Sequence, residues 1–345
     1  MSTPTSLQRV MTAIQLGEPD CVPVVPQITY TTSRLIGINF REAMYSPEKM
    51  AEALLAGYRA FGYDGIYVGW ESSFDLVAEA MGCTLRVPED GIPTVAERVV
   101  NDPNDLGKVR VADPERDGRL PVHLRAVELV RKEAGGGVPV FRYVPGPFTL
   151  AGLLRGQQKF FLDLIRNPDL VRGILNPATE SSRRFAVAAV KHGANIVVVA
   201  DPLASTSVIS PKMFDQFAFS CTKEVVTAIA EAGGVPSLHI CGFTTPIFKR
   251  MVDTGARIVE LDYPVDLGFA KKEIGGKVCV EGNVNPSQTL FGGEPEDVEK
   301  EARECIAKAG GGGGFILSSG CEVPLDAPLE NVRAMVGAAR KYGRR

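Results

Sequence analysis

Three residues of this 345-residue chain have the right chemistry to bind a metal ion together: His239, Cys241 and Cys321. His239 and Cys241 lie in the segment SLHICG (237–242), and the chain contains only three histidines. Residues i and i+2 of a strand point to the same side, so this imidazole and thiol could reach one ion. One imidazole and two thiolates suit Zn²⁺ with a fourth position left open for substrate. A His-x-Cys pair alone would fit core packing equally well, so the metal hypothesis depends on where Cys321 lies.

The elements that would position these residues alternate along the chain, with helices between most of the predicted strands. The predicted strands are Val22–Val25, DGIYVGW (64–70), VPVFRYV (138–144), NIVVVAD (195–201), VPSLHICG (235–242), RIVELD (257–262), KVCVEGNV (277–284) and GFILSSGC (314–321). Short apolar strands that alternate with helices are typical of parallel βα units. The count of eight, and the lack of a G-x-G-x-x-G motif after the first strand, favour a closed (β/α)8 TIM barrel over a doubly wound sheet.

We predict that this barrel is a single domain covering residues 1–345, with an N-terminal helical extension at about Leu7–Leu16. Ser46–Pro47 and Ser210–Pro211 are predicted helix starts, because serine caps free N–H groups and proline suits the first helical position. Residues 84–120 have weak periodicity and are expected to form an irregular excursion, with a hairpin around Val95–Val100. The glycine run 310–314 predicts a permissive loop before the last strand.

Further candidates follow from where barrels place function, which is at the C-terminal ends of the strands. We predict Asp201 and Glu71 as catalytic residues. Asp201 could orient the histidine ligand or contact substrate, or it could simply cap the loop after its strand. Glu71 could be a fourth zinc ligand or a solvated group on the rim. Tyr143, Asn283 and Gln27 are predicted to bind substrate, although Asn283 in GNVNP could equally hold a turn.

Composition excludes several classes of function. The formal net charge of −3 gives no basic field, so nucleic acids and anionic membranes are poor candidates for partners. No apolar run approaches ~18 residues and no signal-peptide core is visible, so a cytoplasmic location is expected. Seven cysteines spread over the chain do not suggest a disulfide framework. Cys21, Cys221, Cys279 and Cys305 are expected to pack in the core.

Several segments resemble the methyltransferase branch of the uroporphyrinogen decarboxylase-like superfamily, with methylcobamide:coenzyme M methyltransferases as the most similar group. The specific segments are LHICG, GNVNP and GFILSSGCEVPLDAPLENVRAM, and GEPDCVPV, VPGPFTLA, ISPKMFDQF and AEAMGC also fit the superfamily. The resemblance implies a (β/α)8 barrel with a zinc site. It also implies that His239, Cys241 and Cys321 are the zinc ligands.

The function implied by this resemblance is a zinc-dependent methyl transfer between a corrinoid, such as methylcobalamin, and an acceptor such as coenzyme M, another thiol or tetrahydrofolate. A common corrinoid-binding motif is D-x-H-x-x-G. Pro121, Val190 and Ser237 stand two residues before the three histidines, so none of the histidines fits this motif. We therefore expect the corrinoid to arrive on a separate protein.

Three alternatives stay open at this point. The first is a related demethylase acting on methoxy or methylthio compounds. The second is a zinc- or corrinoid-protein-binding module without turnover. The third is a uroporphyrinogen decarboxylase-type decarboxylase, but such enzymes carry an arginine-rich RQAGR segment after the first strand. Here the segment is PQITYTTSR, with Arg34 alone, so the cationic partners for a substrate with many carboxylates are missing.

Overall fold

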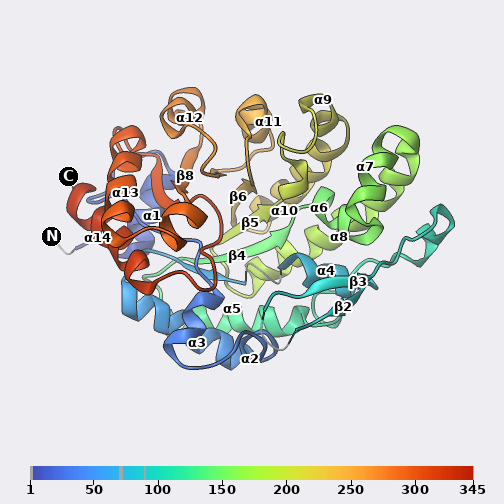
Figure 1. Ribbon diagram of the computed structural model, residues 1–345, viewed down its shortest axis with the longest axis horizontal. Coiled ribbons are helices and arrows are strands. Elements are labelled where there is room, and N and C mark those ends of the chain that lie inside the picture. Colours follow the sequence, from blue (N-terminus) through green and yellow to red (C-terminus); the bar gives the residue numbers. More distant parts are fainter. Residues whose placement is uncertain (1–2, 70–72, 89–90, 345) are drawn as a thin grey trace.

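A seven-stranded parallel sheet forms the centre of the molecule, in a computed structural model that describes residues 3–69, 73–88 and 91–344. The strand order is β1-β4-β5-β6-β7-β8-β9, and each neighbouring pair is parallel. The strands are β1 (Ile66–Val68), β4 (Val140–Pro145), β5 (Ile196–Ala200), β6 (Val235–Ile240), β7 (Ile258–Leu261), β8 (Cys279–Val284) and β9 (Phe315–Ser319). Figure 1 shows the helices arranged around these strands. The predicted TIM-barrel-like α/β fold is confirmed.

The first predicted strand, Val22–Val25, takes a weaker form than expected. It is an extended segment joined to β9 by a single parallel bridge between Val24 and Leu317. On its other side, the N–H of Asp64 donates to the carbonyl of Val24 at 2.7 Å, just before β1. The segment therefore lies between the two edge strands of the curled sheet. Pro23 and Pro26 explain the difference, because a residue without an N–H cannot donate to a strand ladder.

Helices surround the sheet, and their ends follow the predicted capping signals. The helices are α1 (Ser6–Ile14), α2 (Phe40–Tyr45), α3 (Pro47–Phe61), α4 (Ser73–Ala80), α5 (Leu120–Ala134), α6 (Pro147–Arg155), α7 (Gln157–Arg166), α8 (Pro168–Lys191), α9 (Pro211–Met213), α10 (Phe219–Glu231), α11 (Phe248–Asp253), α12 (Leu267–Ile274), α13 (Pro295–Ala309) and α14 (Leu329–Tyr342). Ser46 accepts a hydrogen bond from the N–H of Lys49 at the start of α3. Ser210 accepts one from the N–H of Met213 at the start of α9.

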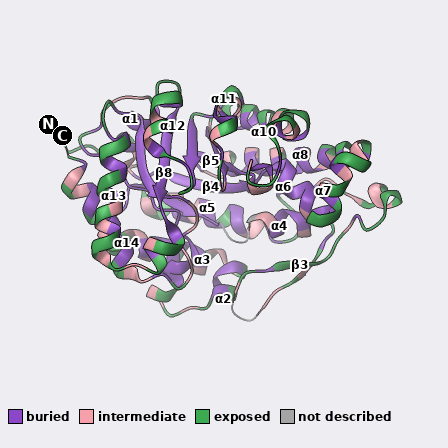
Figure 2. Cartoon of the chain, turned by 45° about the horizontal axis from the view of Figure 1, so that its top comes forward, coloured by how far each residue is buried: buried purple, intermediate pink, exposed green. Residues whose placement is uncertain are grey.

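Short helical turns complete the connections. The 3₁₀ turns are Tyr30–Leu35, Pro103–Lys108, Pro202–Ala204 and Thr245–Ile247, and π turns cover Phe214–Ala218 and Pro286–Phe291. Figure 2 shows the strands of the seven-stranded sheet almost wholly buried, whereas the helices alternate between buried inner and exposed outer faces. Among the described residues, no helix combines the length and apolar character needed to cross a membrane.

The excursion between residues 84 and 120 contains the predicted hairpin, at a shifted position. Strands β2 (Thr84–Arg86) and β3 (Thr94–Glu97) pair antiparallel, so the hairpin begins and ends earlier than the predicted Val95–Val100. Its residues are mostly exposed, which explains the weak apolar periodicity. Figure 1 shows this part of the chain reaching outward from the barrel beside α4.

The N-terminal helix α1 covers the N-terminal end of the barrel. Its apolar residues Val10, Ala13 and Ile14 belong to the same buried cluster as Ile196 and Ile258, the first residues of β5 and β7. This arrangement gives the predicted N-terminal extension a role, because the interior of a barrel is a packed core that must be covered at its base.

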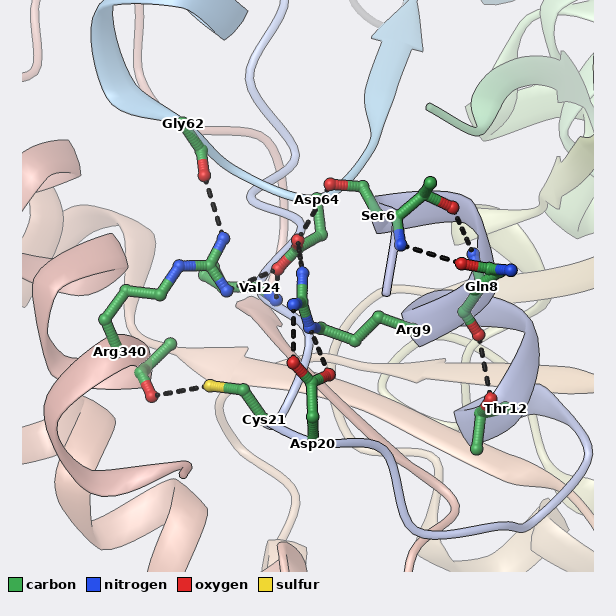
Figure 3. Close-up of polar contacts among 12 residues, drawn as sticks. Ser6, Gln8, Arg9, Thr12, Asp20, Cys21, Val24, Gly62, Asp64 and Arg340 are labelled. Carbon is green, nitrogen blue, oxygen red and sulfur yellow. Dashed lines mark hydrogen bonds and ion pairs between the residues drawn. The ribbon is translucent and has the colours of Figure 1, made fainter. Parts of the chain in front are cut away.

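Ion pairs centred on Asp64 fix both ends of the chain to this base. Asp64 is fully buried, and its carboxylate lies 2.8 Å from a guanidinium nitrogen of Arg9 on α1 and 3.0 Å from one of Arg340 on α14. Arg9 also pairs with Asp20 at 2.8 Å, and the N–H of Val24 donates to Asp64. Figure 3 shows the two arginine side chains meeting at Asp64.

Candidate metal centre

Strands β6 and β9 bring the three predicted metal ligands together at their C-terminal ends. One ligand atom from each of His239, Cys241 and Cys321 lies within 4.8 Å of those of the other two. Nε2 of His239 is 3.1 Å from Sγ of Cys241, and the two sulfurs are 3.7 Å apart. Two thiolates on a tetrahedral zinc ion, with Zn–S bonds of about 2.3 Å, lie about 3.8 Å apart. The spacing of the two sulfurs therefore fits a zinc ion that binds both.

The local structure explains why these side chains face one another. His239 is in the buried part of β6, and Cys241 follows that strand directly, two positions on. Gly242 then turns the chain with φ of +77°, a conformation that glycine adopts without steric strain. Asp262, which follows β7, accepts a hydrogen bond from the N–H of Gly242 at 2.6 Å. This contact fixes the turn next to the Cys241 thiol.

The other side of the His239 ring faces a buried carboxylate that sequence analysis missed. Glu260 of β7 is fully buried, and its Oε2 lies 3.4 Å from Nδ1 of His239. Ser237 donates to Glu260 at 2.8 Å, Gln27 donates at 3.3 Å and Tyr143 donates at 3.4 Å. Nδ1 of His239 thus faces a carboxylate, and Nε2 faces the thiols. The only sequence signal was a charged residue inside the apolar segment RIVELD.

A second buried carboxylate, Glu281 of β8, lies beside Glu260 in the strand register. Tyr67 donates to Glu281 at 2.6 Å and to Glu260 at 3.4 Å. Burial, followed by the charge of Glu260, raises the pKa of Glu281 well above its ordinary value. These effects favour the protonated form of Glu281. Of the two carboxyl groups, Glu260 is the one that faces His239 and accepts from Ser237.

The ligands themselves have shifted pKa values. Contact with Cys241, together with burial, raises the pKa of the Cys321 thiol well above its ordinary value. Burial lowers the pKa of His239, but its close contacts with Cys321 and Glu260 outweigh this effect and raise the pKa to about 10. Both groups thus hold protons that a metal ion must displace before it can bind, which couples metal binding to pH.

Two of the predicted substrate-binding residues lie in the barrel interior. Tyr143 is fully buried and stacks on Tyr67 with ring centroids 4.9 Å apart, and Gln27 is also fully buried. The side-chain amide of Gln27 and the hydroxyl of Tyr143 both contact Glu260. The structure therefore places both residues around the carboxylate next to the metal ligands. A direct contact of either with substrate stays a prediction.

The third predicted substrate residue, Asn283, holds a loop. Its amide nitrogen donates to the carbonyls of Asp262 at 3.2 Å and Val265 at 2.8 Å, in the connection between β7 and α12. The alternative that Asn283 fixes a turn through its side chain agrees with these contacts. Its predicted substrate contact is not tested by them.

The predicted catalytic residue Asp201 contacts the start of α6. Its carboxylate accepts hydrogen bonds from the N–H of Thr149 at 2.7 Å, the hydroxyl of Thr149 at 2.6 Å and the N–H of Phe148 at 3.3 Å. Burial outweighs these bonds and raises the pKa of Asp201 to about 6. Its link to His239 is through the backbone, where the N–H of Asp201 donates to the His239 carbonyl. The other predicted catalytic residue, Glu71, lies outside the described residues.

A separate cavity of about 770 Å³ borders the same rim. It lies among β3, α6 and α7, and its lining includes Thr149, Leu203, Arg98 and Lys159. None of the three metal ligands lines this cavity. Thr149 lies between this cavity and Asp201. It lines the cavity, and its hydroxyl donates a hydrogen bond to the Asp201 carboxylate.

Comparisons with known proteins agree with the fold and show the family of the chain. Residues 5–342 match the family model described as uroporphyrinogen decarboxylase (URO-D). The chain is 30% identical to methylcobamide:CoM methyltransferase MtaA of Methanosarcina barkeri over 99% of each chain. It is 28% identical to a methylated-thiol--coenzyme M methyltransferase of Methanosarcina mazei, over 99% of this chain and 90% of that protein. A solved methyltransferase from Methanosarcina mazei superposes with a TM-score of 0.89 at 30% identity, covering 98% of this chain and 99% of the other.

Proposed function

Because the chain belongs to the uroporphyrinogen decarboxylase (URO-D) family and brings one imidazole and two thiols together at the barrel mouth, we propose that it is a zinc-dependent methyltransferase. In this proposal it transfers a methyl group from a corrinoid to a thiol acceptor. The observation that carries the proposal is the 4.8 Å cluster of His239, Cys241 and Cys321. The similarity to methylcobamide:CoM methyltransferases over the full length supports the choice of reaction.

The zinc ion would be held by His239, Cys241 and Cys321. When bound, Zn²⁺ supplies a Lewis acid that lowers the pKa of a thiol entering its fourth position, so that the sulfur is a nucleophile at neutral pH. The two cysteine thiolates would neutralise the charge of the ion, so that it would take little charge from an acceptor sulfur. Glu260 and the backbone around Gly242 hold the histidine and Cys241 in place.

The transfer itself balances without another reactant. A bond forms between the acceptor sulfur and the methyl carbon, and the cobalt–carbon bond of the methylated corrinoid breaks. The electron pair of that bond stays with cobalt, which changes from cobalt(III) to cobalt(I). The acceptor thiol loses its proton to solvent, and its sulfur supplies the electron pair of the new bond to carbon.

We propose that the corrinoid arrives on a separate protein. The two histidines outside the metal site have other partners: His123 is fully buried against Arg142, and His192 contacts Glu115 and Glu128. Neither histidine has the D-x-H-x-x-G context of a cobalt ligand. An open rim with a thiophilic metal suits a docked corrinoid protein. Coenzyme M or another thiol is the acceptor in this scheme, and tetrahydrofolate is the alternative acceptor.

A second candidate reaction is demethylation of a methylthio compound. The 28% identity to a methylated-thiol--coenzyme M methyltransferase over almost the whole chain favours it specifically. The same ligand set would serve this reaction, with the methyl group entering from sulfur. The decarboxylase alternative has less support. Arg34, the one arginine in the segment after Val25, donates to the carbonyls of Leu325 and Ala327 in the loop after β9.

The test is a screen of acceptors with the zinc-loaded protein. Methylcobalamin and each candidate acceptor are mixed with the protein, and the visible spectrum of cobalt is followed. Loss of methylcobalt(III) with a thiol identifies a methyltransferase and its acceptor class. No spectral change with any thiol, folate or methylated donor, even when corrinoid proteins are supplied, would favour a binding module without turnover.

A further inference from the structure

We propose that Glu260 is a positioning residue of the metal centre, which holds His239 with its proton on Nδ1 so that Nε2 faces the thiols of Cys241 and Cys321. This inference rests on the zinc site of the proposed function and extends it to a residue that does not bind the ion itself. Glu260 lies on the far side of the imidazole ring from the two sulfurs.

The geometry around His239 supports this assignment. Oε2 of Glu260 is 3.4 Å from Nδ1, whereas Nε2 is 3.1 Å from the sulfur of Cys241. A neutral imidazole carries one proton, and a carboxylate can only accept one. With Glu260 beside Nδ1, the proton belongs on that nitrogen and the lone pair of Nε2 is directed at the thiols. Metal-binding histidines commonly bond through their other nitrogen to a carboxylate or carbonyl, which fixes ring and tautomer.

The surroundings of Glu260 show that its position is well defined. The carboxylate accepts from hydroxyls of Ser237, Tyr67 and Tyr143 and from the amide of Gln27. These donors come from four different parts of the chain, and all are fully or almost fully buried. Several neutral donors around one buried carboxylate replace the water that it loses on burial, and they fix its position. Within the described parts of the chain, no lysine or arginine pairs with Glu260.

The adjacent Glu281 supplies a matched control. It is also fully buried, it lies on the next strand and it shares the donor Tyr67 with Glu260. However, among the described residues the carboxylate that pairs with His239 is that of Glu260, and Glu281 makes no such pair. Replacing Glu281 with glutamine therefore leaves the contact with His239 in place. The same substitution at Glu260 changes the carboxylate that faces Nδ1 of His239.

The experiment compares zinc affinity in the wild type, Glu260→Gln and Glu281→Gln by competition with a chromophoric chelator. We expect Glu260→Gln to bind zinc about 10- to 100-fold more weakly, as is typical when the partner of a metal-binding histidine is lost. Glu281→Gln should bind within about threefold of the wild type, because it leaves the contact with His239 intact. The visible spectrum of the Co²⁺-substituted proteins gives a second measurement, which should change in Glu260→Gln alone.

The outcomes separate this inference from the proposed function. A wild type that binds no zinc would overturn the proposed function. Tight zinc binding by the wild type with equal affinity in Glu260→Gln would overturn the positioning role only. Should Glu260→Gln fail to fold, nitrogen-15 NMR of the zinc-loaded wild type decides the question. A proton on Nδ1 of His239 is expected, and metal on Nδ1 would contradict the proposal.

Discussion

The sulfurs of Cys241 and Cys321 lie 3.7 Å apart although 80 residues separate them in the sequence. Cys241 follows β6 and Cys321 follows β9, and these strands are three positions apart in the sheet. In a flat sheet, with about 4.8 Å between neighbouring strands, the two strands would be about 14 Å apart. The curl of the sheet removes that separation. The closeness of the predicted metal ligands therefore depends on closure of the barrel, which the segment around Val24 completes between β9 and the start of β1.

Substitution of Cys321 tests whether this residue is one of the zinc ligands. We expect the wild type to hold one zinc ion per chain and Cys321→Ala to lose most of it, because the described part of the site would keep two of its three ligands, His239 and Cys241. Elemental analysis of the purified proteins measures the metal. Cys221→Ala is the matched control, since this half-buried thiol lies on α10 away from the site and should keep full zinc content. Equal zinc in Cys321→Ala and wild type would remove Cys321 from the centre.

Zinc affinity should weaken as the pH falls. In the proposed site the metal would bind the thiolate form of Cys321, and contact with Cys241 together with burial raises the pKa of this thiol above its ordinary value. At every pH below the pKa of Cys321, a zinc ion must displace the proton of this thiol in order to bind. The zinc affinity therefore falls up to tenfold per pH unit for each proton released. Competition titrations at pH 6, 7 and 8 measure the slope, and calorimetry in buffers of different ionisation enthalpy counts the protons. An affinity independent of pH would contradict thiolate binding.

Asp201 should make the protein less stable at neutral pH than in mild acid. Its pKa is raised to about 6 in the folded state, from 3.8, because of burial. Between these values the folded state binds more protons than the unfolded state, so this group's contribution to the free energy of unfolding falls as the pH rises through about 6. The whole effect is on the order of 3 kcal/mol.

Replacement of Asp201 by asparagine should remove this effect. Denaturant unfolding of the wild type and Asp201→Asn at pH 4.5 and 7 measures the difference, which should shrink by about 2 kcal/mol in the variant. Zinc content should stay unchanged, because the Asp201 carboxylate contacts α6. An unchanged pH dependence would show that Asp201 does not titrate in this way, and a loss of zinc would favour its predicted role at the metal centre.

The ion pairs at the base of the barrel should affect stability without affecting the metal. Asp64→Ala leaves the guanidinium groups of Arg9 and Arg340 without their buried partner, and breaking a buried pair in this way costs about 3–5 kcal/mol. Denaturant unfolding measures the loss. The exposed pair of Asp215 and Arg250 gives the comparison, since Asp215→Ala should cost less than about 1 kcal/mol. Equal effects of the two substitutions would show that burial of Asp64 adds nothing.

The sequence could predict much of the barrel because its signals are local. Seven of the eight predicted strands are apolar runs bounded by turn residues, and each becomes a strand of the main sheet. The i, i+2 spacing of His239 and Cys241, and the position of Cys321 after the last strand, were also visible. The segment Val22–Val25 was harder to predict, because its prolines reduce it to a bridge.

The remaining features depend on contacts between distant parts of the chain. Glu260 and Glu281 interrupt apolar strands. Their burial is explained by hydrogen-bond donors from other parts of the chain, such as Tyr67. A search limited to strand ends could not find them. Similarly, the partners of Asp201 lie 52 and 53 residues earlier, at the start of α6, so its helix-capping contacts have no local pattern.

The most direct test of zinc-dependent methyl transfer is product formation by one preparation in three metal states. The protein is assayed as zinc-loaded, chelator-stripped and zinc-reloaded samples, with methylcobalamin or a methylated corrinoid protein and an excess of coenzyme M. Mass spectrometry measures the methyl thioether formed per chain. The account predicts thioether from the loaded and reloaded samples, little from the stripped sample, and faster transfer from the corrinoid protein because docking aligns the methyl group with the acceptor sulfur. Equal product with and without zinc, or none in any state with any thiol or corrinoid partner, would contradict it.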